Sequence, residues 1–133
     1  MKVLVVEDAA GKYSKIEKEL RNCRISMICR EKTLEDAKRK IEQSCNEKEM
    51  FDFIVTDMQF PAGRGMGELT DAGFRLIDFV NSLSLHIPMI ICSSGRYPVN
   101  KENVLGSLHY SDNADWEAEL RNLIGTIPSP QKQ

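Results

Sequence analysis

Acidic and hydroxyl side chains stand at the ends of three apolar stretches of the sequence. Glu7 and Asp8 follow the first stretch, Asp57 follows the second, and Ser93 and Ser94 follow the third. If these ends meet, three like charges repel one another unless a cation lies between them. Mg²⁺ suits such a set because it prefers oxygen ligands, uses one or two carboxylates and bridges to phosphate. The residues therefore predict Mg²⁺-dependent phosphoryl chemistry.

An aspartate at such a site can itself be the nucleophile. Its carboxylate accepts a phosphoryl group as an aspartyl phosphate if a metal ion and hydrogen-bond donors meet the charge that develops on the phosphoryl oxygens. Ser93 is a candidate donor. We assign no role to Ala10 to Ser14, because this segment lacks the first glycine of a phosphate-binding GxxxxGK[ST] loop.

The elements that must position these residues alternate between strands and helices. Short β-branched runs without polar alternation are typical of strands buried on both faces, and they predict strands at 2–6, 25–29, 51–56 and 87–92, with a brief fifth strand at 107–110. Apolar residues at three- and four-residue spacing predict helices at about 13–23, 34–41 and 71–81, a short or irregular helix within 97–105, and a last helix that Asp112 or Asn113 caps and Gly125 ends. Thr33, three residues before Asp36, is the expected cap of the second helix.

This order predicts an α/β fold with one doubly wound parallel sheet of five strands and helices on both faces. In such sheets ligands bind beyond the carboxyl ends of the strands, at the point where the strand order reverses. Glu7, Asp8, Asp57, Ser93 and Ser94 are all expected at that edge.

Composition narrows the class of protein. A chain of 133 residues suits one domain, and a hydrophobic share of 41% is too high for intrinsic disorder. The net charge of −2 provides no cationic field for nucleic acid or anionic lipid. No apolar run approaches a membrane span, so we expect a cytoplasmic protein with neither a membrane nor a direct nucleic-acid partner. The four cysteines form no CxxC pair and are expected to be ordinary thiols.

Three motifs resemble the receiver domain of bacterial two-component response regulators. They are VLVVED at 3–8, VTDMQFP at 55–61 and IPMIICSS at 87–94, and each stands on the expected element. The resemblance covers residues 1–127 and leaves 128–133 as a polar tail. It implies a flavodoxin-like fold with strand order 2-1-3-4-5.

The resemblance also implies a role for each site residue. Asp57 matches the phosphoacceptor, and Ser93 matches the switch hydroxyl that reaches the phosphoryl group. Glu7 and Asp8 match the acidic pair that holds Mg²⁺, with Asp8 as the direct ligand. Asp57 also contacts the metal, and Gln59 falls where the family uses a main-chain carbonyl as a further metal ligand.

Two features depart from the family's pattern. The lysine that the family carries at the end of the fifth strand has no counterpart, and Ser111 is expected in its place. Arg64, Arg96, Lys101 and His109 are the candidates to replace its charge. The second departure is a glycine-rich stretch at 62–71, which is longer than the family's usual loop and is expected beside the metal site, where it could cover the acceptor or contact a partner.

The leading hypothesis is a stand-alone receiver that accepts a phosphoryl group on Asp57 from a sensor histidine kinase or phosphotransfer protein and signals through contacts with a downstream protein. Because the tail has six residues, we expect no DNA-binding helix-turn-helix and an output that acts through another protein. We expect a phosphoacceptor that hydrolyses its own phosphoryl group rather than an enzyme with a separate substrate. The missing lysine leaves open a degenerate receiver that docks without phosphorylation. A third class is a small Mg²⁺-dependent phosphatase, although residue 59 is Gln rather than the second Asp of a DxD site.

Overall fold

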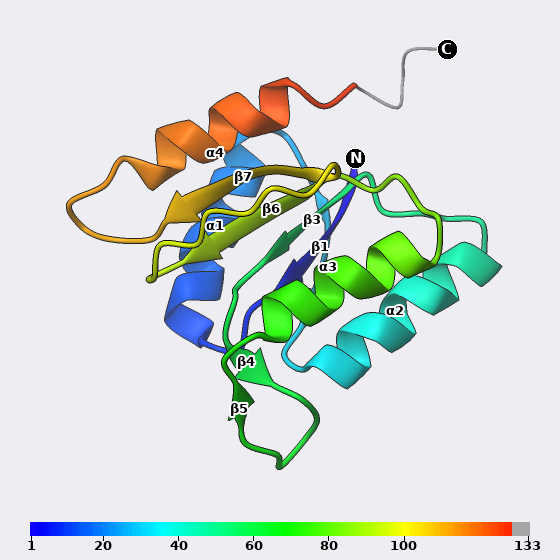
Figure 1. Cartoon of the computed structure of the whole chain (residues 1–133). Helices are drawn as coiled ribbons and strands as arrows, with labels where there is room; N and C mark the ends of the chain where they lie inside the picture. The colour runs from blue at the N-terminus through cyan, green and yellow to red at the C-terminus, as the bar shows by residue number, and fades with distance from the viewer. Residues whose placement is uncertain (129–133) are drawn as a thin grey trace.

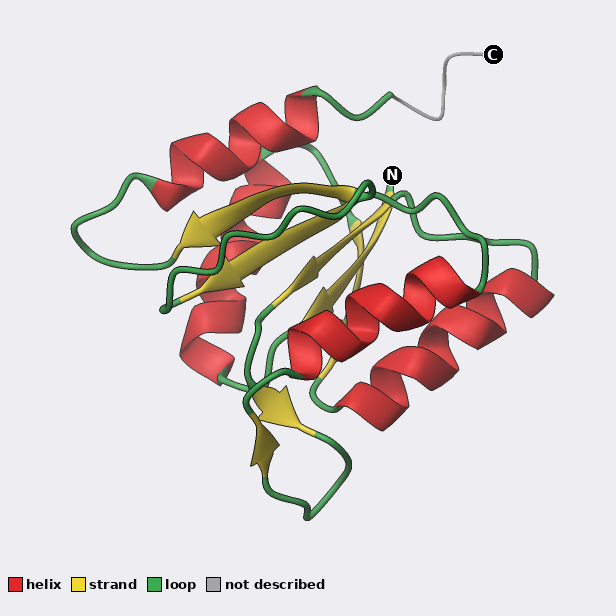
Figure 2. Ribbon diagram, viewed as in Figure 1, coloured by secondary structure: helices red, strands yellow, loops and turns green. Residues whose placement is uncertain are grey.

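Within residues 1–128, one five-stranded sheet forms the middle layer and two helices cover each of its faces (Figure 1). The computed structural model describes residues 1–128. Of the tail expected at 128–133, all but Pro128 lies outside the described residues. Helices α1 and α4 cover one face, and helices α2 and α3 cover the other, as Figure 2 also shows. The predicted doubly wound α/β architecture is confirmed.

The elements follow one another in the order that a doubly wound sheet requires. They are β1 (Lys2–Val6), α1 (Ala10–Asn22), β2 (Met27–Glu31), α2 (Leu34–Asn46), β3 (Phe53–Thr56), β4 (Phe60–Pro61), β5 (Glu68–Leu69), α3 (Ala72–Ser82), β6 (Met89–Ser93), β7 (Val104–His109) and α4 (Trp116–Gly125). The main sheet has the order β2-β1-β3-β6-β7, and all four pairings are parallel. This is the expected flavodoxin-like order 2-1-3-4-5.

Strand β1 shows why the sequence forms a central strand. Val3 and Val5 pack into the cluster under α1 and α4, whereas Leu4 and Val6 pack into the cluster under α2 and α3. All four side chains are fully buried, as expected for a strand with a helix layer on both sides. The strand ends at Val6, because the next residues, Glu7 and Asp8, are acidic. These two residues therefore stand at the carboxyl edge of the sheet.

Two helix starts test the predicted caps. Thr33 caps α2, because its hydroxyl oxygen accepts a hydrogen bond from the Asp36 amide at 3.1 Å. The cap of α4 was predicted wrongly, since Asp115 accepts from the Ala118 amide at 3.3 Å in place of Asp112 or Asn113. Asp115 immediately precedes Trp116, the first residue that α4 buries against the sheet, so packing decides which acid caps the helix.

The crossover between β6 and β7 corrects the prediction of a helix within 97–105. Residues 94–103 contain no helix, and β7 begins at Val104, earlier than the predicted 107. Gly95 and Pro98 both disfavour a helix in so short a link. Tyr97 and Val99 instead pack directly on the core, and the Tyr97 ring meets Phe74 edge to face at 6.4 Å between centroids. Within residues 1–128, helices therefore follow β1, β2, β3 and β7 of the main sheet, whereas the predicted helix after β6 is absent.

The long stretch after Asp57 is partly ordered into a hairpin rather than being a plain loop. β4 and β5 pair antiparallel, with Phe60 opposite Leu69 and Pro61 opposite Glu68. Phe60 is fully buried in the core, and the Ala62 carbonyl accepts a hydrogen bond from the Glu35 amide at 2.9 Å. The hairpin is thus attached to α2 and extends below the sheet edge in Figure 1. None of the helices within residues 1–128 is long and apolar enough to cross a bilayer.

Gly73 and Gly11 provide a matched test of this packing, because each is the second residue of a helix. A Cβ on Gly73 would lie 2.7 Å from the Asp57 carbonyl oxygen and 2.9 Å from Met58 Cα, whereas one on Gly11 meets nothing within 4 Å. We predict that Gly73→Ala lowers the free energy of unfolding by about 1–3 kcal/mol through overpacking. Gly11→Ala should raise it by about 0.5–1 kcal/mol, because alanine restricts the unfolded chain and favours the helix.

Urea denaturation of the two variants and the wild type measures both changes. Equal effects of the two substitutions would contradict the close approach of α3 to the chain at Asp57.

Candidate functional site

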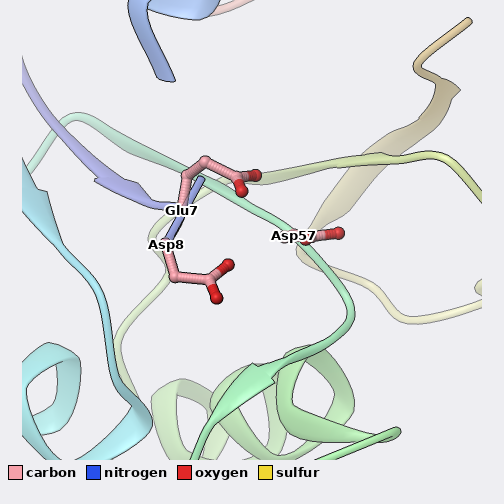
Figure 3. Close-up of side chains that lie close together, drawn as sticks. All are labelled: Glu7, Asp8 and Asp57. Carbon is pink, nitrogen blue, oxygen red and sulfur yellow. The ribbon is translucent and has the colours of Figure 1, made fainter. Parts of the chain in front are cut away.

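Glu7, Asp8 and Asp57 meet at the carboxyl edge of the sheet. Because β1 and β3 are parallel neighbours with Val6 opposite Thr56, both strands deliver their next residues to the same place. Each of the three acids offers a carboxylate oxygen, and these atoms all lie within 4.8 Å of one another. Figure 3 shows Glu7 and Asp8 leaving the end of β1 beside Asp57. The predicted acidic cluster therefore exists.

A cleft opens at this edge, and most of the predicted residues line it. Besides the three acids, its walls include Gln59, Ser93 and Ser94. The lining also includes three side chains to which the sequence analysis gave no role, namely Lys12, Glu68 and Tyr110. Glu68 comes from the hairpin, so the expectation that the 62–71 stretch lies beside the acids is confirmed for this residue.

Lys12, in the first turn of α1, carries its ammonium into the acidic cluster. Its Nζ lies 2.8 Å from Glu7 Oε1 and 3.3 Å from Asp57 Oδ1. The same nitrogen donates a hydrogen bond to the Cys92 carbonyl at 2.6 Å and lies 5.3 Å from the centre of the Tyr110 ring. Lys12 therefore partly neutralises the repulsion among the carboxylates, with only 10% of its side chain exposed.

The charges at this edge shift the ionisation of two groups. Burial raises the pKa of the Glu7 carboxyl, and the attraction of Lys12 only partly offsets that rise. Burial alone would lower the pKa of Lys12, but the nearby Glu7 and Asp57 carboxylates outweigh it and raise the pKa of the ammonium. Lys12 is therefore a permanent positive charge at neutral pH.

Asp57 is held by the backbone amide of the next residue and by α3. Its Oδ1 accepts a hydrogen bond from the Met58 amide at 2.7 Å, and its carbonyl oxygen lies against Gly73. The side chain keeps 14% of its surface exposed, so the carboxylate is reachable from the cleft. These contacts give Asp57 a fixed orientation with access to solvent, which a nucleophile at this position needs.

Ser93 and Gln59 connect the cleft to the crossover between β6 and β7. Ser93 ends β6, and its Oγ accepts a hydrogen bond from the Gly95 amide at 3.3 Å. The Gln59 side-chain amide donates to the Tyr97 hydroxyl at 3.0 Å. Both residues line the cleft as predicted, and both also bond to the helix-free crossover.

The candidates proposed to replace the missing lysine do not line the cleft in the described part of the chain. Arg64 pairs with Asp36, and Lys101 lies near Asp78 at the surface. Arg96 is exposed on the crossover, and His109 lines a separate cleft with it.

Ser111 is also not at the position expected for it. It lies in another cleft, together with Lys15 and Lys18, whereas the neighbouring Tyr110 reaches the site. Side chains alternate faces along a strand and its extension, so a one-residue error in placing the end of β7 exchanges Ser111 for Tyr110.

Sequence reasoning missed Lys12 because a lysine in a one-sided helix is typical of a solvated face. Two local signals point to it. First, the helix dipole favours acidic residues and disfavours cations in the first turn, yet the first turn of α1 has no acidic residue and contains Lys12. Second, the N-cap residue of α1 is Ala9, whose side chain makes no capping hydrogen bond. A helix start that breaks both preferences is a place to look for function.

The donor set suits a small divalent cation. Opposite ligands of an octahedral Mg²⁺ lie about 4.2 Å apart and adjacent ligands about 3 Å apart. The carboxylate oxygens of the cluster, all within 4.8 Å of one another, therefore need to approach by at most about 2 Å to share one ion. Glu7 is engaged by Lys12 and by the Ala9 amide, which donates to its Oε2 at 3.0 Å. Among residues 1–128 the Asp8 carboxylate has no such partner, so Asp8 is the most available metal ligand of the three acids.

No protein-family model matches the sequence, and no curated protein matches it closely. Several solved structures resemble the fold over nearly the whole chain. A response regulator receiver domain from Clostridium thermocellum has a TM-score of 0.68 at 18% identity, covering 95% of this chain and 92% of that one. The receiver domain of a sensor histidine kinase from Pseudomonas aeruginosa, with magnesium coordinated in its active site cleft, has a TM-score of 0.68 at 19% identity, covering 96% and 98%.

The receiver domain of a histidine kinase from Arabidopsis thaliana, complexed with Mg²⁺ and BeF₃⁻, has a TM-score of 0.60 at 20% identity and covers 95% of this chain and 88% of that one. These similarities show that the chain has the fold of response regulator receiver domains.

The thiol beside Lys12 provides a test of burial at the site. Burial raises the pKa of Cys92 to about 12, whereas Cys23, Cys29 and Cys45 are partly exposed. Because the thiolate is the reactive form, we predict that a disulfide reagent modifies three thiols in the native protein and the fourth only after unfolding. Cys92→Ser should remove the slow fraction and leave the other three, as followed by absorbance. Rapid reaction of all four thiols would contradict the packing of β6.

Proposed function

We propose that this protein is a phosphoacceptor of the receiver type, which takes a phosphoryl group on Asp57 in a Mg²⁺-dependent reaction and signals through protein contacts. The observation that carries the proposal is the position of Asp57, which is reachable from a cleft that also holds the Glu7 and Asp8 carboxylates and the Ser93 hydroxyl. The proposal is also supported by the fold, which resembles that of receiver domains over nearly the whole chain.

The transfer forms one bond and breaks one. A carboxylate oxygen of Asp57 attacks the phosphorus of a phosphohistidine on a sensor kinase or phosphotransfer protein. The P–N bond breaks, and the imidazole nitrogen keeps its electron pair. The product is an aspartyl phosphate, whose later hydrolysis returns Asp57 and inorganic phosphate. Asp57 suits the role of nucleophile because its orientation is fixed while its carboxylate stays accessible.

The chain's own oxygen atoms would hold the metal ion. Asp8 and Asp57 are the direct carboxylate ligands in this proposal, and the main-chain carbonyl of Gln59 is a further ligand. Glu7 supports them from behind, because both of its oxygens are engaged by the chain itself. When bound, Mg²⁺ neutralises the charge on the phosphoryl oxygens during transfer.

Ser93 and Gln59 provide a route from the site to the surface. If the Ser93 side chain rotates so that its oxygen leaves the Gly95 amide and its hydroxyl donates to a phosphoryl oxygen, the Gly95 amide loses its acceptor. The start of the crossover at 94–103 then loses one of its attachments to the cleft, and the Gln59 to Tyr97 hydrogen bond is a second connection. The surface around this crossover is therefore the one that a downstream protein would recognise.

A direct test measures the covalent adduct. We predict that the protein, incubated with Mg²⁺ and a small phosphodonor such as acetyl phosphate, gains one phosphoryl group that is stable to acid and labile to base. Asp57→Asn should remove the adduct completely, because an amide is not a nucleophile toward phosphorus. Asp78→Asn is the matched control, since Asp78 is an exposed acid on α3 outside the cleft.

The readout is intact mass before and after treatment with base. Failure to form an adduct at saturating donor, or an adduct that persists in Asp57→Asn, would reject the proposal.

A second candidate function is a degenerate receiver that docks to its partner without phosphorylation. It is favoured by Lys12, which already supplies a positive charge among the acids without any metal ion. In that case Asp57→Asn leaves partner binding unchanged.

A further inference from the structure

Lys12 is the one cationic residue lining the acidic cleft within residues 1–128. Three oxygen atoms lie near its ammonium, namely Glu7 Oε1 at 2.8 Å, Asp57 Oδ1 at 3.3 Å and the Cys92 carbonyl oxygen at 2.6 Å. The ammonium donates a hydrogen bond to the Cys92 carbonyl oxygen and forms ion pairs with the two carboxylates. The fold therefore holds this charge in a fixed position rather than leaving it on a mobile side chain.

Two of the three anchors do not depend on Asp57. Glu7 is itself held by the Ala9 amide, and the Cys92 carbonyl belongs to the central strand β6. The Tyr110 ring, 5.3 Å from Nζ, adds a cation–π contact on a further side. If the Asp57 carboxylate is modified, Glu7 and Cys92 keep the ammonium in place. Its nitrogen lies 3.3 Å from Asp57 Oδ1 and is therefore within reach of a group attached to that carboxylate.

We propose that Lys12 is the built-in cation of this site and has two opposing effects. In the resting protein its ammonium neutralises Glu7 and Asp57 and so competes with Mg²⁺ for their charge. During transfer, on the proposed function, it donates a hydrogen bond to an oxygen of the phosphoryl group on Asp57. The proton stays on Nζ throughout, so Lys12 acts by charge and hydrogen bonding rather than as an acid.

Removal of this charge should change two measurable quantities in opposite directions. Without the ammonium, Mg²⁺ meets a more negative cleft and binds more tightly. The phosphoryl oxygens lose a preorganised donor, and transfer becomes slower even when Mg²⁺ is saturating. A lysine with a merely structural role would not separate the two effects, because a loosened site weakens metal binding and slows transfer together.

The test compares Lys12→Met with the wild type. Methionine keeps an unbranched apolar chain and removes the charge. Lys12→Arg keeps the charge, and Lys18→Met repeats the lysine-to-methionine change at an exposed position of the same helix. Mg²⁺ binding is followed by the fluorescence of Trp116, the single tryptophan, whose ring lies 5.1 Å from that of Tyr110. The Mg²⁺-dependent rise of the unfolding temperature provides a second readout.

We expect Lys12→Met to bind Mg²⁺ about tenfold more tightly than the wild type. Its rate of adduct formation from acetyl phosphate at saturating Mg²⁺ should fall on the order of a hundredfold. Lys12→Arg should stay close to the wild type in Mg²⁺ affinity, and Lys18→Met should match the wild type in both measurements. If Lys12→Met unfolds, Lys12→Gln repeats the test with a neutral donor for the Cys92 carbonyl.

The outcomes test the two effects of Lys12 separately and distinguish them from the proposed function. If the charge-removing variants bind Mg²⁺ as tightly as the wild type or more weakly, Lys12 does not compete with the metal ion. If their rate of adduct formation is unchanged, Lys12 does not stabilise the phosphoryl group during transfer. A wild-type protein that forms no adduct contradicts the proposed function and, with it, the second role of Lys12. In that case the Mg²⁺ titration still decides whether Lys12 competes with the metal.

Discussion

The repulsion among three carboxylates at one sheet edge is the constraint on which the rest of this structure depends. Parallel neighbours necessarily end on the same side, so β1 and β3 bring Glu7, Asp8 and Asp57 together whether or not a cation is present. Burial makes the charge on Glu7 especially costly, and it raises the pKa of that carboxyl. Lys12 lowers this cost from within the chain, because its ammonium contacts two of the three acids.

The proposed phosphoacceptor follows a well-packed strand, whereas the neighbouring crossover at 94–103 has no regular structure. Asp57 follows a strand packed on both faces and lies against α3 at Gly73, where even a methyl group would collide with the backbone. Ser93, in contrast, leads directly into a crossover that has no helix and is attached to the cleft by single hydrogen bonds. Such an arrangement suits a site in which the acceptor stays fixed while its surroundings respond, as the proposed function requires.

Sequence patterns predicted the elements well where one physical effect dominates. The strand at 2–6 has its predicted bounds because every side chain from Val3 to Val6 is apolar and buried, and Thr33 caps α2 as its spacing to Asp36 indicates. The prediction was wrong where several contacts compete. Tyr97 and Val99 pack on the core and replace the helix expected after Pro98, and burial of Trp116 selects Asp115 as the cap of α4. The hairpin at 60–69 depends on Phe60 reaching the core, which no local pattern indicates.

The sequence by itself determined that acids stand at the ends of buried strands, and hence that an acidic cleft exists, because strand burial and parallel order follow from residue type and spacing. Only the tertiary structure decided which cation meets those acids. Lys12 is five residues from Glu7 and 45 from Asp57 in the sequence, on a helix whose pattern is that of a solvated surface. Its ammonium reaches the cluster because α1 docks against β1, β3 and β6, and that docking depends on contacts among residues far apart in the chain.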